Sequence, residues 1–257
     1  MRRVSITLKK TLLASLAVTA LVCTTAFAVP VQTDWKKIKA PALRAFKPQQ
    51  PSRIQLDNGL VIFLQPDSEL PLIEVGLSVR GGSREEPADK VGLTNLYSQV
   101  LRSGGTKSRS GDQIDDFLAA RGAEIEVGGD ADSIDLQASF LKTDFDDVFK
   151  LVLEIMREPE FRDDKLDLAK RQLYTGIKRR NDNPMSIAMR ESAKLAFGPS
   201  HPYARHAEFA TVAAVSREDL KRWHQQRVMP NNMMLGVTGD FDPAQMEAKL
   251  RALLSGW

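Results

Sequence analysis

The clearest pattern of hydrophobic and polar positions lies in residues 92–106, where apolar side chains recur every three or four residues. This stripe consists of Leu93, Leu96, Val100 and Leu101. Such spacing is typical of an amphipathic helix, and the two glycines that follow end it. Asn95, Ser98 and Gln99 share a second face of the same segment. The pattern therefore predicts a helix with one buried stripe and a polar face beside it.

Several other segments have the pattern of β-strands. Residues 60–64 are almost all apolar, which predicts a strand buried on both faces. Asn58-Gly59 precedes this strand and is typical of a hairpin turn, because both residues readily adopt positive φ angles. Residues 124–140 alternate between apolar and polar positions, which predicts an antiparallel hairpin with one wet face and residues 128–130 between its strands. The remaining strands are predicted at residues 72–79 and 233–239.

Helical periodicity recurs in the rest of the chain. Helices are predicted over residues 112–121, from residue 144 to the segment before Pro159, over 162–181, over 184–197, from residue 216, and over 243–254. Residues 198–215 are predicted to be mostly loop. The order is strands, helices, hairpin, helices, strand, helix. It predicts an α+β fold, a two-layer sandwich with a mostly antiparallel sheet and helices packed mainly on one face.

The first 28 residues have the pattern of a secretion signal. Basic residues precede an apolar run at residues 11–22, and Ala26-Phe27-Ala28 offers a small-x-small cleavage site. An uncleaved anchor is the alternative, but the apolar run is short for a membrane-spanning helix. We therefore predict that residues 1–28 are a signal peptide cleaved after Ala28. The protein would be periplasmic or secreted, with no integral membrane segment after cleavage.

Removal of this segment changes the charge of the chain. The whole sequence has a formal net charge of +3, but residues 1–28 hold four basic and no acidic residues, so residues 29–257 are close to neutral. Nothing in that balance indicates a nucleic-acid partner. The one cysteine, Cys23, lies in the same segment, so the remainder cannot form a disulfide bond. Residues 29–51 are rich in proline, lysine and glutamine and are predicted to be an extended N-terminal arm, with a disordered leader as the alternative.

Seven short motifs then occur in a characteristic order. They are Leu56-Asp57-Asn58-Gly59-Leu60, Gly82-Ser83-Arg84-Glu85-Glu86, Gly92-Leu93 through Gly105-Thr106, Asn181-Asp182-Asn183-Pro184, His201-Pro202-Tyr203, Pro230-Asn231-Asn232-Met233 and Val237-Thr238-Gly239-Asp240. Together they resemble the N-terminal domain of the M16 metallopeptidases, the insulinase or pitrilysin-like family, and especially its bacterial and mitochondrial-processing-peptidase branch. The resemblance covers about residues 52–257. It implies a LuxS/M16-like sandwich. It also implies a second homologous domain in each subunit, absent from this chain, and two halves that close as a clamshell around an unfolded peptide.

The resemblance also implies a zinc site with the inverted motif His-x-x-Glu-His and a distant glutamate. Two histidines at i and i+4 supply two ligands from one helix face, and the glutamate takes a proton from the zinc-bound water. In this chain the two histidine positions fall on Asn95 and Gln99, the base falls on Ser98, and the distant glutamate falls on Gly176. Amides are poor zinc ligands, an unassisted serine is no base, and glycine has no side chain. We therefore predict no catalytic residue, no metal ligand and no cofactor, although zinc is expected in active relatives.

Other candidate residues leave alternatives open. Gly176 follows the inward Leu173 by three residues, which indicates a core-facing glycine at a close helix contact, with drift after loss of the ligand as the alternative. His201 and His206 are predicted to be polar loop residues, and a replacement zinc site is the alternative. His224 has no carboxylate or histidine at ligand spacing. Basic clusters at 170–171, 178–180 and 102–109 form either a solvated face or a contact with an acidic peptide or partner.

The sequence thus predicts a catalytically inactive M16-like protein. Its role would be that of a non-catalytic subunit that binds an unfolded peptide or small protein and forms a heterodimer with an active zinc peptidase. A stand-alone peptide-binding or chaperone-like module is the alternative from a different class. A truncated product of a two-domain subunit and an active zinc metallopeptidase are the others.

Overall fold

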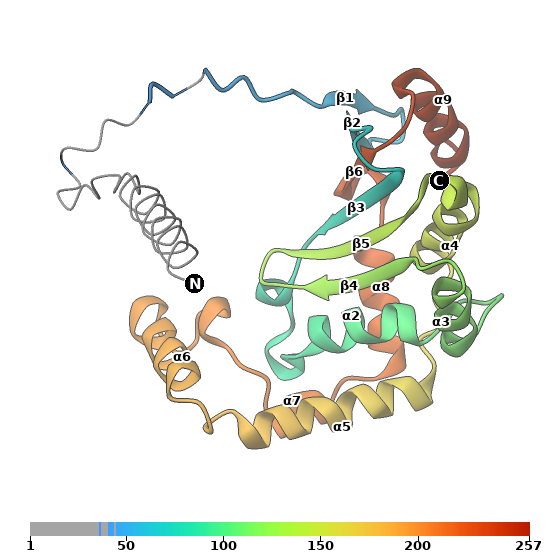
Figure 1. The fold of residues 1–257 in the computed structure, drawn as a ribbon. Coiled ribbons are helices and arrows are strands. Elements are labelled where there is room, and N and C mark those ends of the chain that lie inside the picture. Colours follow the sequence, from blue (N-terminus) through green and yellow to red (C-terminus); the bar gives the residue numbers. More distant parts are fainter. Residues whose placement is uncertain (1–35, 37–40, 44) are drawn as a thin grey trace, which may run out of the picture. The chain divides into compact units, whose positions relative to one another are not determined.

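The computed structural model describes Lys36, residues 41–43 and residues 45–257 (Figure 1). The predicted signal peptide and about half of the predicted arm lie outside these residues. The chain divides into residues 1–48 and residues 49–257, and the elements named below all belong to the second part. No helix in the described residues is both long enough and apolar enough to cross a membrane.

Six strands of the described chain form one sheet in the order β1-β2-β6-β3-β5-β4. They are β1 (Ser52–Gln55), β2 (Val61–Pro66), β3 (Leu72–Arg80), β4 (Glu124–Gly129), β5 (Ser133–Leu141) and β6 (Met233–Gly239). All neighbouring strands are antiparallel except β2 and β6, which are parallel. The mostly antiparallel sheet is therefore confirmed, and Asn58-Gly59 does lie in the turn between β1 and β2.

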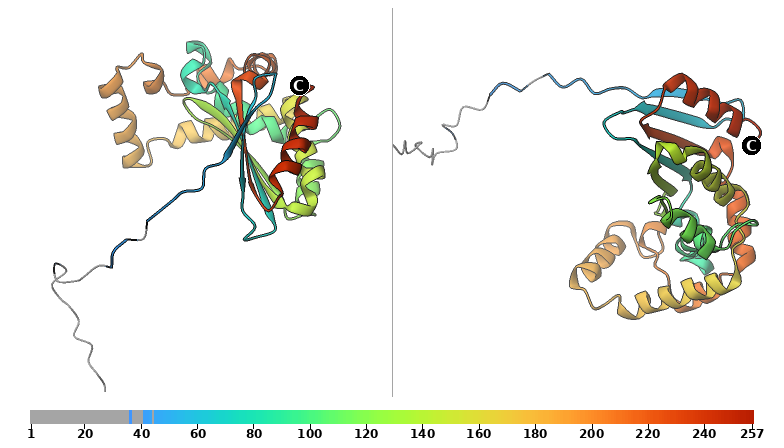
Figure 2. Two further views of the ribbon diagram at one scale, coloured as in Figure 1. Left: turned by 90° about the horizontal axis from the view of Figure 1, so that it is seen from above. Right: turned by 45° about the vertical axis from the view of Figure 1, so that its right-hand side comes forward.

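Helices follow the strands in the predicted order. The α-helices are α2 (Leu93–Ser103), α3 (Gly111–Ala119), α4 (Phe145–Arg157), α5 (Asp163–Arg179), α6 (Pro184–Phe197), α7 (Phe209–Ala213), α8 (Arg217–Arg227) and α9 (Pro243–Leu254). Short 3-10 turns are η2 (Ser83–Glu85), η3 (Ala88–Lys90), η4 (Lys142–Asp144), η5 (Pro202–Ala204) and η6 (Pro230–Asn232). Figure 2 shows α3, α4 and α9 side by side on one face of the sheet. The predicted two-layer α+β sandwich is confirmed.

One face of the sheet is covered and the other is open. Alternate residues of β3 from Ile73 to Val79 are buried, and the residues between them are partly or fully exposed. The same alternation holds in β2, where Ile62 and Leu64 are buried but Val61 and Phe63 are partly exposed. The prediction that residues 60–64 are buried on both faces is therefore wrong. Helices cover only one face, and the apolar residues on the other face remain at the surface.

The predicted loop at residues 198–215 is only partly a loop. It contains η5 and the short helix α7, which Glu208 precedes in a capping box and which buries Val212. A five-residue helix shows little more than one turn of periodicity, and this explains why the sequence pattern missed it.

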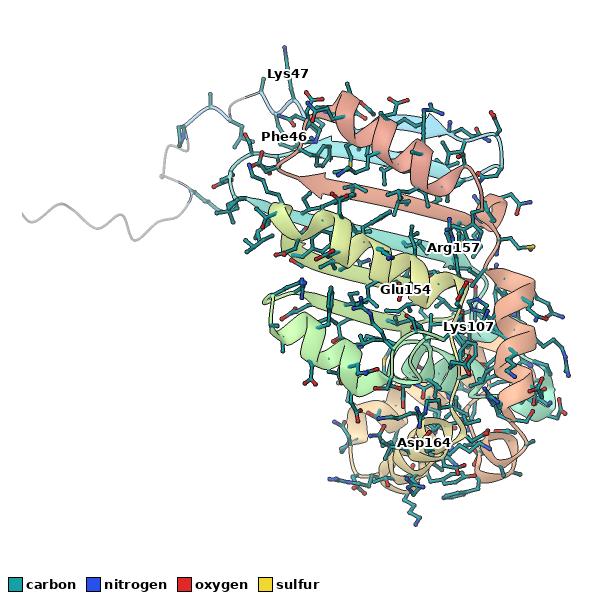
Figure 3. The ribbon with its side chains drawn as sticks, turned by 90° about the vertical axis from the view of Figure 1, so that its right-hand side faces the viewer. Phe46, Lys47, Lys107, Glu154, Arg157 and Asp164 are labelled. Atoms are coloured by element: carbon teal, nitrogen blue, oxygen red, sulfur yellow. The ribbon has the colours of Figure 1, made fainter. Side chains whose placement is uncertain are left out.

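The segment after α2 is fastened to the end of α4. The Ser108 hydroxyl donates to the Glu154 carboxylate over 2.8 Å, and the Lys107 ammonium lies 3.8 Å from the Glu158 carboxylate. Figure 3 shows Lys107, Glu154 and Arg157 at the same end of α4. These contacts fix the C-terminal end of α2 against the helices that cover the sheet.

Candidate functional site

The helix α2 is held at its N-terminus by a buried carboxylate. Gly92 precedes it with a φ of 107°, a conformation that favours glycine, and has no side chain that could cap the helix. Glu86 instead accepts the backbone N–H of Gly92 over 2.9 Å and that of Thr94 over 2.6 Å. A carboxylate at this position also interacts favourably with the positive end of the helix dipole. Glu86 of the second sequence motif thus has a structural role in orienting α2.

The same helix approaches the edge strand β4 closely. A Cβ atom added at Gly129 would lie 2.7 Å from Cγ2 of Thr94, which is closer than real Cβ contacts allow. The prediction that residues 128–130 form the hairpin turn is therefore partly wrong, because Gly128 and Gly129 belong to β4. Glycine at 129 serves the contact between strand and helix, and the turn itself follows at residues 130–132.

The buried side of α2 makes a polar contact with α8 that the sequence pattern did not reveal. The Tyr97 side chain is fully buried, and its hydroxyl lies 2.8 Å from Nδ1 of His224 in α8. The Phe161 ring packs against both rings, with centroid distances of 5.5 Å and 5.7 Å. Burial lowers the pKa of His224 to about 4, although a hydrogen bond to the Met156 backbone acts in the opposite direction. Burial also raises the pKa of Tyr97. Both groups are therefore neutral near pH 7 and serve to attach α2 to α8.

The three candidate positions on α2 contact one another. The Asn95 side chain is exposed, and its Oδ1 accepts a hydrogen bond from Nε2 of Gln99 over 2.9 Å. The Ser98 hydroxyl donates to the backbone carbonyl of Asn95 over 3.1 Å. Oε1 of Gln99 is buried and has no hydrogen-bond partner in the described part of the chain. The i, i+4 spacing predicted from the sequence therefore does bring Asn95 and Gln99 together.

Ser98 and Gln99 line a cavity of about 290 Å³ between α2, β4 and α5. The other walls come from Arg102, Ser103, Glu126, Val127, Lys165, Leu168, Ala169 and Gln172. Gly176 lies one helical turn beyond Gln172 on the same face of α5, but it lines a neighbouring cavity instead. The structure thus brings Ser98 and Gln99 into one cavity and leaves Gly176 outside it.

The core-facing orientation predicted for Gly176 is wrong. The residue is exposed, and no atom lies within 4 Å of the position that a Cβ would occupy. The buried stripe of α5 runs through Leu166, Ala169 and Ile177, and Gly176 lies at the edge of that stripe. No close helix contact therefore requires a glycine here.

The residues at this site do not fit a zinc ion. A catalytic zinc site takes three protein ligands, normally imidazole nitrogens and carboxylate oxygens. Asn95 and Gln99 offer neutral amides that are bonded to each other, and Gly176 offers nothing. The cavity has one carboxylate, Glu126, and two cationic side chains also line it. Among the described residues, no group of three or more His, Cys, Asp or Glu is arranged to hold a metal ion.

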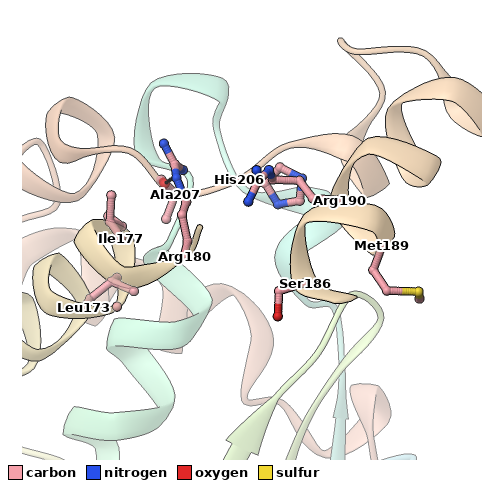
Figure 4. Close-up of a pocket in the computed structure, with 9 residues that line it drawn as sticks. Leu173, Ile177, Arg180, Ser186, Met189, Arg190, His206 and Ala207 are labelled. Atoms are coloured by element: carbon pink, nitrogen blue, oxygen red, sulfur yellow. Dashed lines mark hydrogen bonds between the residues drawn. The ribbon is translucent and has the colours of Figure 1, made fainter. Parts of the chain in front are cut away.

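The neighbouring cavity has a volume of about 450 Å³ and lies between α5 and α6 (Figure 4). Its lining combines apolar side chains with Arg180, Arg190 and His206. Burial and the nearby charges of Lys194, Arg190 and Arg180 lower the pKa of His206, so the imidazole is neutral near pH 7. His201 does not line this cavity, because it stacks on Phe197 and accepts the backbone N–H of Tyr203.

Comparison with known protein families gives two matches. Residues 61–200 match the family model described as insulinase, peptidase family M16. Residues 214–257 match the model described as the peptidase M16 inactive domain. The first match alone covers more than half of the chain and includes α2, β4 and all of α5.

Curated relatives include proteins with and without a peptidase description. Human cytochrome b-c1 complex subunit 2 is 31% identical over 49% of this chain and 28% of its own length. A zinc protease of Mycobacterium leprae is 25% identical over 77% of this chain and 45% of its own length. The non-peptidase homolog YmxG of Helicobacter pylori is 21% identical over 72% of this chain and 43% of its own length. The chain thus spans less than half the length of these relatives.

Two solved structures have the same fold. A peptidase M16 inactive domain from Pseudomonas fluorescens superposes with a TM-score of 0.74 at 23% identity, over 81% of this chain and 50% of that one. The periplasmic protease PqqL of Escherichia coli gives a TM-score of 0.72 at 20% identity, over 82% of this chain and 24% of that one. Inactive and non-peptidase members are therefore among the relatives of this protein. The family matches, together with the shared fold, establish that the chain belongs to the insulinase family of peptidases, family M16.

Proposed function

We propose that this protein is the non-catalytic partner of an active M16 zinc peptidase and that it holds an unfolded peptide or small protein. One observation carries the proposal. The helix α2 is capped by Glu86 and packed against β4, but its polar face offers two amides and a hydroxyl where metal ligands and a base would be needed. We interpret α2 on this basis as the frame of a peptidase site without its chemistry.

The cavity beside α2 has groups that suit a peptide backbone. Oε1 of Gln99 is a buried acceptor with no partner among the described residues, so a backbone N–H would satisfy it. The strand β4 pairs with β5 alone within the described sheet, so its other edge can add an extended segment. An extended chain beside β4 would pass the mouth of the cavity that Gln99 and Glu126 line.

The relatives support a non-catalytic role and an export route. YmxG is described as a non-peptidase homolog, and the structural neighbour PqqL is a periplasmic protease. We extend these descriptions to the present chain as a periplasmic or secreted protein with residues 1–28 as its signal peptide. An active M16 subunit would supply the zinc site, and the two chains would form a heterodimer.

Two measurements test this proposal. A pull-down from periplasmic extract with the full chain as bait should recover a protein that contains an intact His-x-x-Glu-His motif. The purified chain should bind unfolded peptide, cut none of it and hold no stoichiometric zinc. Stoichiometric zinc together with peptide cleavage, both abolished by Asn95→Ala or Gln99→Ala, would overturn the proposal. Peptide binding without any M16 partner would favour a stand-alone binding module.

A further inference from the structure

The cavity between α5 and α6 has a chemistry unlike that of the cavity beside α2. Leu173 and Ile177 from α5 and Met189 from α6 give it apolar walls. Arg180, Arg190 and His206 line the same space and come from the end of α5, from α6 and from the segment before α7 (Figure 4). The missing side chain at Gly176 leaves part of the α5 wall open.

The two arginines of this cavity are held in place by the protein. Arg180 donates to the Ala207 carbonyl over 3.2 Å and to the Glu208 carboxylate over 2.7 Å. Arg190 donates to Oδ1 of Asn181 over 2.9 Å and to Oε1 of Glu191 over 3.3 Å, and only 16% of its side chain is exposed. An oriented, partly desolvated guanidinium binds a carboxylate more strongly than a mobile surface lysine does.

The charges around the cavity leave a surplus of positive charge. Arg180, Arg190 and Lys194 face His206, whereas the nearby carboxylates are Glu191 and Glu208. Nε2 of His206 is buried and has no hydrogen-bond partner among the described residues. An anionic group in the cavity would balance the surplus charge and lower the cost of keeping these cations together.

We propose that this cavity binds a carboxylate attached to an apolar group, namely the free C-terminus of a peptide whose last side chain is apolar. The apolar side chain would pack against Leu173, Ile177 and Met189, and the terminal carboxylate would pair with Arg190 and Arg180. Purely polar anions such as inorganic phosphate would leave the apolar walls wet. The inference rests on the proposed function in one respect, because it takes the carboxylate from a bound peptide.

The cavity between α5 and α6 lies close enough to the cavity beside α2 for one peptide to occupy both. Gln172 lines the cavity beside α2, and Arg180 lines this one, eight residues later on the same helix. That spacing corresponds to about 12 Å along α5. An extended peptide covers this distance with about four residues. The C-terminus of a peptide lying beside β4 therefore reaches Arg180 without a second molecule.

Calorimetric titration of the full chain with two matched pairs of probes tests the inference. The first pair is a short unfolded peptide that ends in leucine, with a free carboxylate or with an amidated C-terminus. The second pair is N-acetyl-leucine and N-acetyl-leucinamide, which test the carboxylate pocket without the rest of a peptide. In each pair we expect the free acid to bind at least about tenfold more tightly than the amide, the usual value of a charge-assisted hydrogen bond.

Three variants locate the effect. Arg190→Met should abolish the preference for the free acid. Arg179→Met is the matched control, because this arginine precedes Arg180, is 75% exposed and does not line the cavity. Gly176→Leu places a side chain into open space, so it should fold normally and still block both free acids.

Each outcome has a defined meaning. Equal binding of acid and amide in both pairs overturns the inference, and peptide binding in that case leaves the proposed function intact. An Arg190-dependent preference for N-acetyl-leucine with no binding of either peptide would show a carboxylate pocket that takes no peptide, and this result overturns both the peptide-holding function and the peptide C-terminus as the occupant. Loss of the preference in Arg179→Met as fully as in Arg190→Met also overturns the inference, because general charge would then explain it.

Discussion

Two glycines of this protein should respond in opposite directions to the same substitution. Gly176 lies in the last turn of α5, and no atom would contact a Cβ added there. A glycine within a helix costs about 1 kcal/mol relative to alanine, because it loses more backbone freedom on folding. Gly176→Ala should therefore raise the free energy of unfolding by about 1 kcal/mol. For a domain of this size the melting temperature should rise by about 2–4 °C.

Gly129 presents the opposite environment. A Cβ at this position would lie 2.7 Å from Cγ2 of Thr94, and Thr94 is itself buried. A buried, β-branched side chain has little room to move away, so either α2 or β4 must shift. Overpacking of this kind costs about 1–3 kcal/mol, and Gly129→Ala should lower the free energy of unfolding by that amount.

Urea unfolding followed by circular dichroism measures both effects. Gly128→Ala is the matched control in the same strand, because its Cβ would meet no atom within 4 Å. The dependence of the free energy of unfolding on urea concentration, the m value, should stay constant across the variants. A constant m value would show that the folded and unfolded states are otherwise unchanged. Clear destabilisation by Gly176→Ala would refute the reasoning, because it would mean that a close helix contact does require glycine there.

Three further substitutions test the frame around α2 and the ionised groups near it. Glu86→Ala should lower the free energy of unfolding by about 1–3 kcal/mol in urea titrations, because two buried N–H groups would lose their acceptor. Folding lowers the pKa of His224 from about 6.5 to about 4. The stability that this neutral imidazole contributes is therefore fully present above pH 6.5 and is lost as pH falls towards 4. In His224→Gln the melting temperature should depend less on pH across that range. Burial alone would raise the pKa of Asp219, but hydrogen bonds from Lys90 and Ser216 lower it to about 2. The stability that this carboxylate contributes is therefore present above about pH 4 and lost as pH falls towards 2, and Asp219→Asn should remove that acid-dependent loss.

The sequence pattern predicted those parts of the fold in which burial has a single period. The helix α4 and the hairpin of β4 and β5 lie where the periodicity indicated, because each has one covered and one exposed face. The pattern failed for β2, since a nearly continuous apolar run does not reveal which face the helices cover. It also failed for α7, which is too short to show a period.

The site could be predicted only as positions along α2. The spacing of Asn95, Ser98 and Gln99 fixes their common face, and the structure confirms that their side chains and backbone contact one another. The pair Tyr97 and His224 could not be predicted, because 127 residues separate them and each fits an ordinary helix pattern. The cavities depend in the same way on where α5 and α6 lie, and no local pattern contains that information.

The frame of α2 and its polar face depend on different residues. Glu86, Tyr97 and Gly129 hold the helix through its N-terminus, its buried side and its contact with β4. The side chains of Asn95 and Gln99 take part in none of these contacts, and a hydrogen bond joins one to the other. The contacts that keep the helix in position are therefore distinct from the two amide side chains on its polar face. A chain can lose the ligands and the base of a peptidase site and still keep the cavity walls and the edge strand, which are the parts that a peptide-holding subunit needs.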